Sequence, residues 1–308
     1  MMTNKKVYIV IVTYNSMKWM EKCLESLRAS QYPLHIIVVD NCSKDNTVSY
    51  LSEQKDVELI VNKQNKGFGQ ANNQGIKFAL EQGADYCFLL NQDAYIHPDT
   101  IEKLIETHLQ FPSAGILTPV HLNGNGAGLD PYYRNFVLPT SDAFLTDACI
   151  GEVKRYYDVD LVPAAGWFIP KNTLEKIGGF DPLFFHYGED DNYMQRLRYH
   201  QMPIVMDRQA FIRHDRESTV GNAKVYLNKK NRRELLILAS DINYSKGYII
   251  QKIGKQFFAN LSLHFFYLLG RKFGAMWNFF GDYWYLYANR KRLRVSRENN
   301  RTLQKNWL

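Results

Sequence analysis

The sequence has few cysteines, and they lie far apart. Four occur in 308 residues, and no two of them form a CxxC pair. Structural zinc sites and small disulfide scaffolds depend on closely spaced cysteines, so neither is expected here. Widely spaced thiols are compatible with a reducing compartment, and we predict a cytoplasmic location. The four are Cys23, Cys42, Cys87 and Cys149.

Long apolar runs are also absent from the sequence. A membrane-spanning helix needs about 20 consecutive, mostly apolar residues, and no stretch of this chain approaches that length without polar interruptions. Met1–Lys6 leads directly into a strand-like segment and holds no apolar region typical of a secretion signal. We therefore expect neither a membrane-spanning helix nor a secretion signal.

Acidic residues are fewer than basic ones, which leaves a formal net charge of +7. This balance predicts an anionic partner, and nucleic acid, anionic lipid and a nucleoside diphosphate all carry the required charge. Much of the positive charge lies after residue 224, in a part of the chain that is also rich in aromatic residues. The basic groups there are Lys229-Lys230, Arg232-Arg233, Arg271-Lys272 and Arg290-Lys291-Arg292.

The N-terminal part of the chain alternates between short β-branched runs and amphipathic segments. Alternation of this kind predicts right-handed βαβ units and a parallel sheet. Apolar residues at every second position, or in an unbroken run, indicate strands, and apolar residues three or four apart indicate helices. Strands are expected at 7–13, 35–40, 57–61 and 86–90, and helices at 17–27, 47–51, 70–80 and 98–109.

From residue 121 the alternation loosens. Residues 121–140 are rich in Gly, Asn and Pro and are predicted to form a loop. Beyond residue 221 the chain becomes helical, aromatic and basic. We therefore predict an α/β domain over 1–220 and a helical C-terminal region over 221–308. Between them we expect strand-like pieces around Gly166-Trp167, a helix at 189–200 and short strands at 203–206 and 211–212.

Polar residues follow several of the predicted strands. Thr13-Tyr14-Asn15 ends the first, Asp40 ends the second, and Asn91-Gln92-Asp93 ends the fourth. In an open α/β sheet, ligands bind in the crevice beyond the carboxyl ends of the strands. A carboxylate such as that of Asp93 can hold a hard divalent cation against a phosphate there. Asp40 can accept a hydrogen bond from a base or a ribose, or it can cap a turn.

Two glycines stand where the third predicted strand gives way to a helix. Gly67-x-Gly69 suggests a dinucleotide-binding turn, but Asn72 occupies the place of the third glycine that this fingerprint needs. The fingerprint also belongs after the first strand of a unit and not after the third. We therefore expect a tight turn close to a nucleotide, with a turn that binds nothing as the alternative.

Three acidic residues, Glu189-Asp190-Asp191, precede a predicted helix. The helix dipole alone explains acids in a first turn, at about 0.3–1 kcal/mol each. The aromatic stretch 184–187 before them favours a second interpretation. In it, these aromatic side chains line a sugar pocket, and one of the carboxylates takes a proton from an acceptor. Trp167 could stack on a ligand or lie in the core. His214 could bind a metal or be an ordinary surface histidine.

The order of these segments resembles that of the family 2 glycosyltransferases, especially their bacterial rhamnosyltransferase-like members. The resemblance covers residues 5–217 and rests on the order of six short motifs. It implies the GT-A fold, a Rossmann-like nucleotide-binding mixed sheet flanked by helices, here with a C-terminal helical extension. It also implies an inverting transfer of a sugar from a UDP-, dTDP- or GDP-linked donor to a hydroxyl of a glycan or lipid-linked acceptor, in bacterial cell-surface polysaccharide or glycan synthesis.

The resemblance assigns roles to individual residues. Asp190, with Glu189, falls on the family's catalytic acid pair. The family's DxD element falls on Asn91-Gln92-Asp93, so that Asp93 and His214 are expected to hold Mg²⁺ or Mn²⁺. Asn91 replaces an aspartate, which predicts a modest metal affinity. The residues expected to bind the nucleotide sugar are Thr13, Tyr14, Asn15, Asp40, Gly67, Asn72, Asn91, Gln92 and Trp167.

Two other classes of protein remain open. A nucleotidyltransferase also combines an α/β sheet with acidic metal ligands, but it usually has a Gly-rich, basic motif near the first strand that this chain lacks. A non-catalytic protein could bind nucleotide sugars or membranes. The aromatic and basic stretch 255–289 fits the surface of an anionic membrane, or packing on the catalytic domain or within a homodimer. No nucleic-acid partner is expected.

Overall fold

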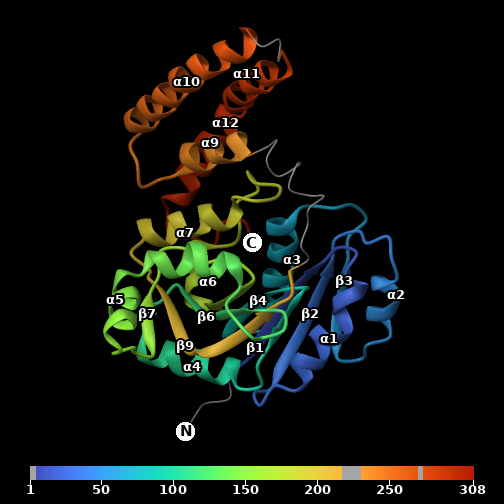
Figure 1. Ribbon diagram of the computed structural model, residues 1–308. Coiled ribbons are helices and arrows are strands. Elements are labelled where there is room, and N and C mark those ends of the chain that lie inside the picture. Colours follow the sequence, from blue (N-terminus) through green and yellow to red (C-terminus); the bar gives the residue numbers. More distant parts are fainter. Residues whose placement is uncertain (1–4, 217–229, 270–272) are drawn as a thin grey trace.

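The computed structural model describes residues 5–216, 230–269 and 273–308. Its centre is a nine-stranded mixed sheet with helices on both faces (Figure 1). The strand order is β3-β2-β1-β4-β8-β6-β9-β5, and β7 pairs with β9 at the side of this path. The predicted α/β class with a mixed sheet is confirmed.

The first half of the sheet is parallel, as the alternating pattern predicts. Strands β1 to β4 pair in the order β3-β2-β1-β4, and every pair among them is parallel. The strands are β1 Val7–Thr13, β2 Leu34–Asp40, β3 Val57–Val61 and β4 Tyr86–Asn91. The helices that connect them are α1 Met17–Arg28, α2 Thr47–Ser52 and α3 Phe68–Glu81.

Alternate residues of these strands supply two separate cores. Ile9 and Ile11 of β1 pack with helices α1 and α4 (Thr100–Gln110) on one face of the sheet. Val10 packs with α3 on the other face, together with α6 (Lys171–Ile177) and α7 (Glu189–Tyr199). Burial on both faces explains why β1 is an unbroken hydrophobic run up to Val12 and not apolar only at every second position.

The second half of the sheet is antiparallel in part. β8 (Gly166–Pro170) runs antiparallel to β4, and β9 (Ile204–His214) runs parallel to β6 (Ile116–Asn123). Two short strands, β5 (Ala94–Ile96) and β7 (Tyr156–Asp158), pair with β9.

Two predictions for this half were wrong. β9 is one strand where two short ones were expected. Its polar middle bulges out of the pairing with β6 between Asp207 and Phe211, and the buried Asp207 accepts hydrogen bonds from Arg155 at 3.0 Å and from Thr107 at 2.8 Å. The predicted loop at 121–140 begins inside β6 and contains two short helical turns. These are Tyr133–Val137 and Leu138–Thr140, and helix α5 (Asp142–Ile150) follows them.

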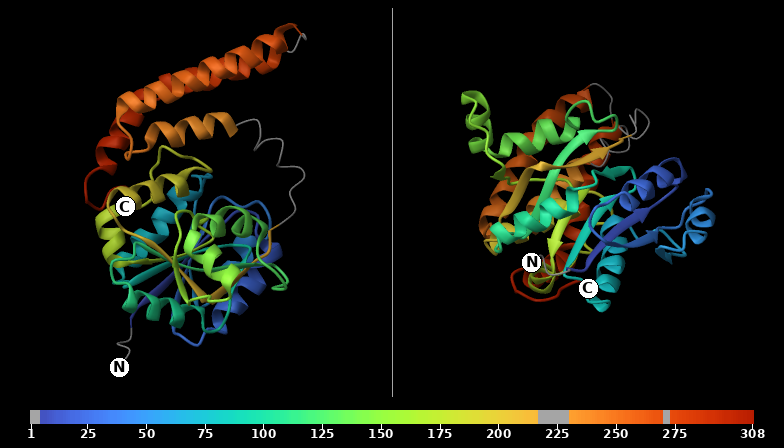
Figure 2. Two further views of the ribbon diagram at one scale, coloured as in Figure 1. Left: turned by 60° about the vertical axis from the view of Figure 1, so that its left-hand side comes forward. Right: turned by 90° about the horizontal axis from the view of Figure 1, so that it is seen from below.

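The C-terminal region is helical, as predicted. Helices α9 and α12 lie against α7, whereas α10 and α11 extend away from the sheet (Figures 1 and 2). The predicted domain boundary near 220 lies outside the described residues. Among those that are described, no helix is both long and apolar enough to cross a membrane. The helices are α9 Lys230–Ser240, α10 Lys246–Leu269, α11 Phe273–Ala288 and α12 Arg290–Asn300.

Candidate active site

The ends of β1 and β4 meet at one edge of the sheet. The backbone N–H of Tyr14 donates to Oε1 of Gln92 at 2.8 Å, which joins the two predicted segments directly. The Tyr14 side chain is half exposed beside this contact. The structure therefore brings together the residues that follow the first and fourth strands, at the edge where α/β proteins bind ligands.

Asp40, at the end of the neighbouring strand β2, is fully buried. Its carboxylate accepts hydrogen bonds from the Thr13 hydroxyl at 3.0 Å and from the backbone N–H groups of Cys42 and Ser43 at 3.1 and 2.9 Å. The Ser43 hydroxyl donates to it as well. Asp40 and Thr13 therefore organise the turn after β2, and a role of Asp40 in binding a base or ribose stays a prediction.

We expect Asp40→Ala to lower the free energy of unfolding by about 2–4 kcal/mol, because it leaves several buried donors without a partner. Urea unfolding followed by circular dichroism measures this change. Asp160→Ala removes an exposed carboxylate and is expected to stay within about 0.5 kcal/mol of the parent. Normal stability of Asp40→Ala, combined with loss of donor binding, would show that Asp40 acts only on the ligand.

Asn15 closes the other side of this turn. Its backbone N–H donates to the Ser43 hydroxyl at 2.9 Å, and its side-chain oxygen accepts from the Lys44 N–H at 2.7 Å. Its φ of 51° lies in the left-handed region, where asparagine is tolerated better than most residues. Asn15 therefore fixes the path of the loop around the predicted pocket.

Gly67 and Asn72 have structural partners of their own. Gly67 has a φ of 84°, and a Cβ at this position would lie 2.0 Å from the Phe185 carbonyl oxygen. Glycine is thus required for the turn and for the close approach of the segment at Phe185. Asn72 is buried and donates to the Phe68 carbonyl at 3.0 Å. Neither residue needs a nucleotide to explain its place.

Trp167 is a core residue, which corrects its prediction as a ligand-binding side chain. It has no exposed surface, and its indole N–H donates to the Val162 carbonyl at 3.2 Å. Its ring stacks on Phe180 at 5.7 Å and contacts Tyr193 at 5.3 Å. A ring enclosed in this way cannot stack on a sugar.

The predicted metal ligands Asp93 and His214 lie side by side. The pairing of β5 with β9 places Ala94 opposite His214. As a result, His214 Nε2 is 3.3 Å from Asp93 Oδ1 and 3.4 Å from the Asn91 amide nitrogen. The imidazole is buried, and Asp93 is partly exposed. One imidazole and one carboxylate from distant parts of the chain thus face the same point.

Asp130 lies behind His214. Its Oδ2 is 3.7 Å from His214 Nδ1, a buried nitrogen that has no hydrogen-bond partner. Arg216 donates to the same carboxylate at 2.8 Å. At 3.7 Å, Asp130 and His214 form an electrostatic contact and not a hydrogen bond. A carboxylate behind a metal-binding histidine favours the tautomer that presents Nε2 to the metal. Sequence analysis missed this residue, which lies in the predicted loop 121–140.

The residues present fit a divalent cation that the substrate helps to hold. Within the described ranges, no group of three or more His, Cys, Asp or Glu side chains is arranged to hold a metal alone. Cations that bind with nucleotides usually have one or two protein ligands and complete their shell with phosphate oxygens and water. Asp93 and His214 match that pattern. The imidazole favours Mn²⁺ over Mg²⁺, which prefers oxygen ligands throughout.

His121, for which the sequence predicted no role, fills the space beside His214. Its ring centroid is 4.7 Å from that of Tyr133 and 6.3 Å from that of His214. Burial lowers the pKa of His121 well below its usual range, and the neighbouring His214 and Arg216 lower it further. His121 is therefore neutral at physiological pH and packs as an uncharged ring near His214.

The three carboxylates at the start of α7 have raised pKa values. Burial and then Asp190 raise the pKa of Glu189 to about 8 and that of Asp191 to about 7, and burial also raises the pKa of Asp190. Glu189 is buried with one oxygen unpartnered, whereas Asp190 is partly exposed. A Cβ at Gly69 would lie 3.6 Å from Glu189 Cβ, so the carboxylates stand near the start of α3.

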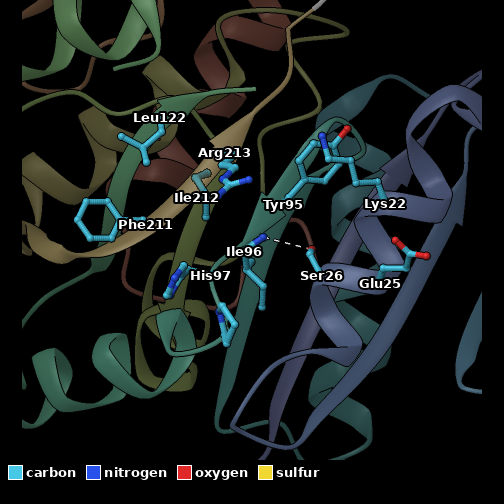
Figure 3. A pocket seen from close by; sticks show the side chains of 11 residues that line it. Lys22, Glu25, Ser26, Tyr95, Ile96, His97, Leu122, Phe211, Ile212 and Arg213 are labelled. Carbon is cyan, nitrogen blue, oxygen red and sulfur yellow. Dashed lines mark hydrogen bonds between the residues drawn. The ribbon is translucent and has the colours of Figure 1, made fainter. Parts of the chain in front are cut away.

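A separate cavity lies outside the predicted site residues. It has a volume of about 550 Å³ and lies between α1 and the ends of β5 and β9 (Figure 3). In it the Lys22 ammonium stands 4.2 Å from the centre of the Tyr95 ring. Its walls include Arg213 but none of the predicted site residues. The candidate active site is therefore an open edge of the sheet and not this cavity.

Solved structures share this fold. A mannosyltransferase from Pyrobaculum calidifontis, solved with GDP-Man and Mn2+, superposes with a TM-score of 0.58 at 17% identity, over 80% of this chain and 66% of that one. S. aureus TarS 1-349, solved with UDP-GlcNAc, gives 0.54 at 17% identity, over 78% of this chain and 67% of that one. The predicted GT-A fold is confirmed.

Known protein sequences are also similar to this chain. The dTDP-rhamnosyl transferase RfbF of Shigella flexneri is 25% identical over 198 residues, and the match spans 64% of each protein, less than two thirds of that relative. The N-acetylglucosaminyl-diphospho-decaprenol L-rhamnosyltransferase of Mycobacterium tuberculosis is 24% identical over 258 residues, 75% of this chain and 83% of that protein. The family described as glycosyl transferase family 2 matches residues 8–168, more than half of the chain. The chain therefore belongs to glycosyl transferase family 2.

Proposed function

We propose that the protein transfers a sugar from a nucleoside-diphosphate donor to an acceptor hydroxyl, with inversion at the anomeric carbon. The observation that carries this proposal is the placement of two acidic groups around the carboxyl edge of the parallel strands. Asp93 and His214 form one group, and the carboxylates of α7 form the other, near the start of α3. The first group can hold a cation against the donor's diphosphate. The second group can accept a proton from the acceptor hydroxyl.

Asp190 is proposed as the base. Its carboxylate takes the proton of the acceptor hydroxyl while the acceptor oxygen bonds to the anomeric carbon. The bond from that carbon to the diphosphate oxygen breaks in the same step, and the electron pair leaves with the nucleoside diphosphate. Because Asp190 and Asp191 are partly exposed and Glu189 is buried, an acceptor can reach Asp190 but not Glu189. Asp190 is preferred over Asp191 because it falls on the family's catalytic acid pair.

The leaving diphosphate gains negative charge in this step. Asp93 and His214 would hold Mn²⁺ or Mg²⁺, which when bound neutralises charge on the diphosphate oxygens. Asp130 would favour the tautomer of His214 that presents Nε2 to the cation. Gln92, Tyr14 and Asn15 would border the nucleotide, since their backbone and side chains form the rim at the ends of β1 and β4.

The names of two similar proteins support a choice of donor and acceptor class. Both are named as rhamnosyltransferases, one for a dTDP-linked donor and one for an acceptor linked to decaprenol through a diphosphate. We propose a nucleotide-linked deoxyhexose or hexose as the donor and a lipid-linked glycan as the acceptor. The product would then belong to cell-surface polysaccharide or glycan synthesis.

A donor screen tests the proposed reaction. Purified protein is incubated with UDP-, dTDP- and GDP-sugars and Mn²⁺, and the release of nucleoside diphosphate is measured with and without a lipid-linked acceptor. Acceptor-dependent release of nucleoside diphosphate is the expected result. Release of pyrophosphate from a nucleoside triphosphate and a sugar phosphate would instead indicate a nucleotidyltransferase. Donor binding without any release or transfer would indicate a non-catalytic binding protein.

We also propose that α10 and α11 contact an anionic membrane. These helices project from the catalytic part of the molecule (Figure 2), and Phe257 of α10 packs on Phe279 of α11 at 5.2 Å. Their outer surfaces expose Phe258 by 70% and Trp284 by 68%. The exposed bases Lys252, Lys255, Arg290 and Lys291 flank these side chains. Exposed aromatics beside basic residues favour the interface of a membrane with negatively charged headgroups.

We expect the protein to cosediment with phosphatidylglycerol vesicles and not with neutral phosphatidylcholine vesicles. Phe258→Ser combined with Trp284→Ser should weaken this binding roughly tenfold or more, because each removes a large apolar side chain from the contact. Leu109→Ser removes a side chain that is 62% exposed on α4 and serves as the control. Equal binding to both kinds of vesicle, or an equal loss in the control, would contradict the proposal.

A further inference from the structure

Helix α9 of the C-terminal region packs against the helix that carries the carboxylates. Gln195 of α7 donates to the Ile237 carbonyl at 3.2 Å, and Asn192 donates to the Ser240 hydroxyl at 3.4 Å. At the start of α7, a Cβ on Gly188 would lie 3.2 Å from Ile237 Cγ1. The contact between α7 and α9 therefore reaches the residue directly before the carboxylates.

Buried polar contacts fix α9 in this place. The Arg297 guanidinium of α12 is buried and donates to the carbonyls of Ala239, Asp241 and Tyr244 at the end of α9. Asp181, which precedes α7, holds α12 in turn. Its carboxylate accepts from the Ser296 hydroxyl at 2.5 Å and from the Asn300 amide at 2.9 Å. Loss of either partner in these hydrogen bonds would leave buried polar groups unpaired. We therefore regard α9 and α12 as integral to the catalytic part of the molecule.

Arg233 lies on the face of α9 that meets the start of α7. It precedes Ile237 by four residues, a spacing that puts both side chains on one face of a helix. Its guanidinium carbon is 5.6 Å from the centre of the Tyr187 ring, which stands three residues before Asp190. The side chain of Arg233 is partly buried there. A guanidinium from the C-terminal region thus enters the surroundings of the carboxylates.

We propose that Arg233 is a positioning residue of the active site, whose positive charge favours the ionised form of Asp190 so that this carboxylate can accept a proton. This role rests on the proposed function, because it assumes that Asp190 is the base. It gives the C-terminal region a part in catalysis in addition to any contact with a membrane. A chain that ended before α9 would lose this charge.

The charges around Asp190 support this role. Glu189 and Asp191 stand beside it on α7, and His186 lies in the segment before the helix. Burial lowers the pKa of His186, and Arg233 lowers it further, so His186 is neutral and supplies no positive charge. Arg233 lowers the pKa of Glu189, Asp190 and Asp191 and opposes the effect of burial on all three. Backbone N–H groups at the helix start act in the same direction on Asp190.

The pH dependence of transfer tests the proposal. In Arg233→Gln the carboxylates hold their protons to higher pH, so the acidic limb of kcat/KM should move upward. A shift of about one pH unit lowers kcat/KM about tenfold on that limb and leaves the plateau near the parent value. Arg233→Lys should restore most of the parent profile. Lys230→Gln removes an exposed charge from the same helix and should leave the profile unchanged.

A second readout does not depend on activity. A carboxylate whose pKa is raised on folding binds more protons in the native state, so stability falls as pH rises from the unfolded pKa near 4 to the folded pKa. Without Arg233 this fall should be larger and should extend to higher pH. We expect the difference in Tm between about pH 5 and about pH 9 to be greater for Arg233→Gln than for the parent or for Lys230→Gln. Loss of packing alone would lower Tm equally at both pH values.

The two readouts separate the possible failures. An unchanged pH profile and an unchanged pH dependence of Tm in Arg233→Gln would overturn the positioning role and leave the transfer reaction intact. If the parent protein transfers no sugar from any donor, the proposed function fails. The Tm comparison then still decides whether Arg233 sets the charge of the carboxylates.

Discussion

Replacement of Asp190 by asparagine is expected to lower kcat for sugar transfer by about 10²–10⁴-fold, the usual contribution of a general base. The amide is nearly isosteric with the carboxylate but cannot accept the acceptor's proton. The donor's diphosphate is proposed to bind at Asp93 and His214, so the Kd for the donor should change little. A coupled assay of nucleoside diphosphate release measures kcat, and calorimetry with donor and Mn²⁺ measures Kd.

The neighbouring carboxylates provide controls for this substitution. Asp191→Asn keeps the proposed base and removes a like charge that raises the pKa of the cluster, so it should retain most of the activity. Glu189→Gln removes a buried acid whose one oxygen is unpartnered, and it should affect activity less than Asp190→Asn. If Asp190→Asn kept near-normal transfer and Asp191→Asn or Glu189→Gln lost it, the base would be misassigned.

The pH dependence of the parent protein follows from the same carboxylates. A base must be ionised, and burial raises the pKa of Asp190 above the usual aspartate value of about 3.9. The activity should therefore rise with pH through an apparent pKa well above that value. This apparent pKa belongs to the coupled carboxylates of α7 as a group and not to one residue.

The ends of β1, β2 and β4 could be predicted from sequence because each of these strands is a mostly apolar run that stops at a polar residue. Parallel neighbours then place Tyr14 and Gln92 at one edge, and the structure joins them at 2.8 Å. His214 lies 3.3 Å from Asp93, as two ligands of one metal would, and their binding of a metal stays a prediction. This placement depends on a strand whose polar middle made it look like two short ones.

Contacts between distant parts of the chain could not be predicted. The burial of Trp167 depends on Phe180 and Tyr193, which come later in the sequence and belong to no common local pattern. Asp130 reaches His214 only because the turn after β6 folds back beside β9. Arg233 reaches the carboxylates only because α12 holds α9 against α7. No residue spacing in the sequence indicates these long-range contacts.

The same contacts change the interpretation of the C-terminal region. Sequence analysis offered two alternatives, a membrane surface or packing on the catalytic domain. In the structure, α9 packs on α7, and α12 is held by the buried Asp181 that precedes α7, whereas α10 and α11 expose Phe258 and Trp284. Packing on the catalytic part is therefore observed for α9 and α12, and contact with a membrane stays a proposal for α10 and α11. A lipid-linked acceptor bound near α10 and α11 would approach Asp190 from the side where α9 lies.

The second large effect is expected from Asp93→Ala. This substitution removes the proposed metal ligand with the full negative charge, and Asn91 nearby cannot replace it because its amide is neutral. We expect kcat/KM to fall by roughly 10²–10³-fold, the range seen when one preorganised group that stabilises transition-state charge is lost. Titration of Mn²⁺ followed by electron paramagnetic resonance, with and without nucleoside diphosphate, gives a readout that is independent of turnover.

Mn²⁺ binding in the parent should be weak without nucleoside diphosphate and much tighter with it. In the proposed site, the described part of the chain supplies Asp93 and His214, and the phosphates would complete the shell. Asp93→Ala should abolish the tight binding, and Asp130→Asn should weaken it about 10–100-fold, as loss of a partner behind a metal ligand does. Asp85→Asn, at the opposite end of β4 where Asp85 pairs with Lys5 at 3.1 Å, should leave it unchanged. Transfer that persisted in excess chelator, or tight Mn²⁺ binding in Asp93→Ala, would show that the charge on the diphosphate is neutralised by other groups.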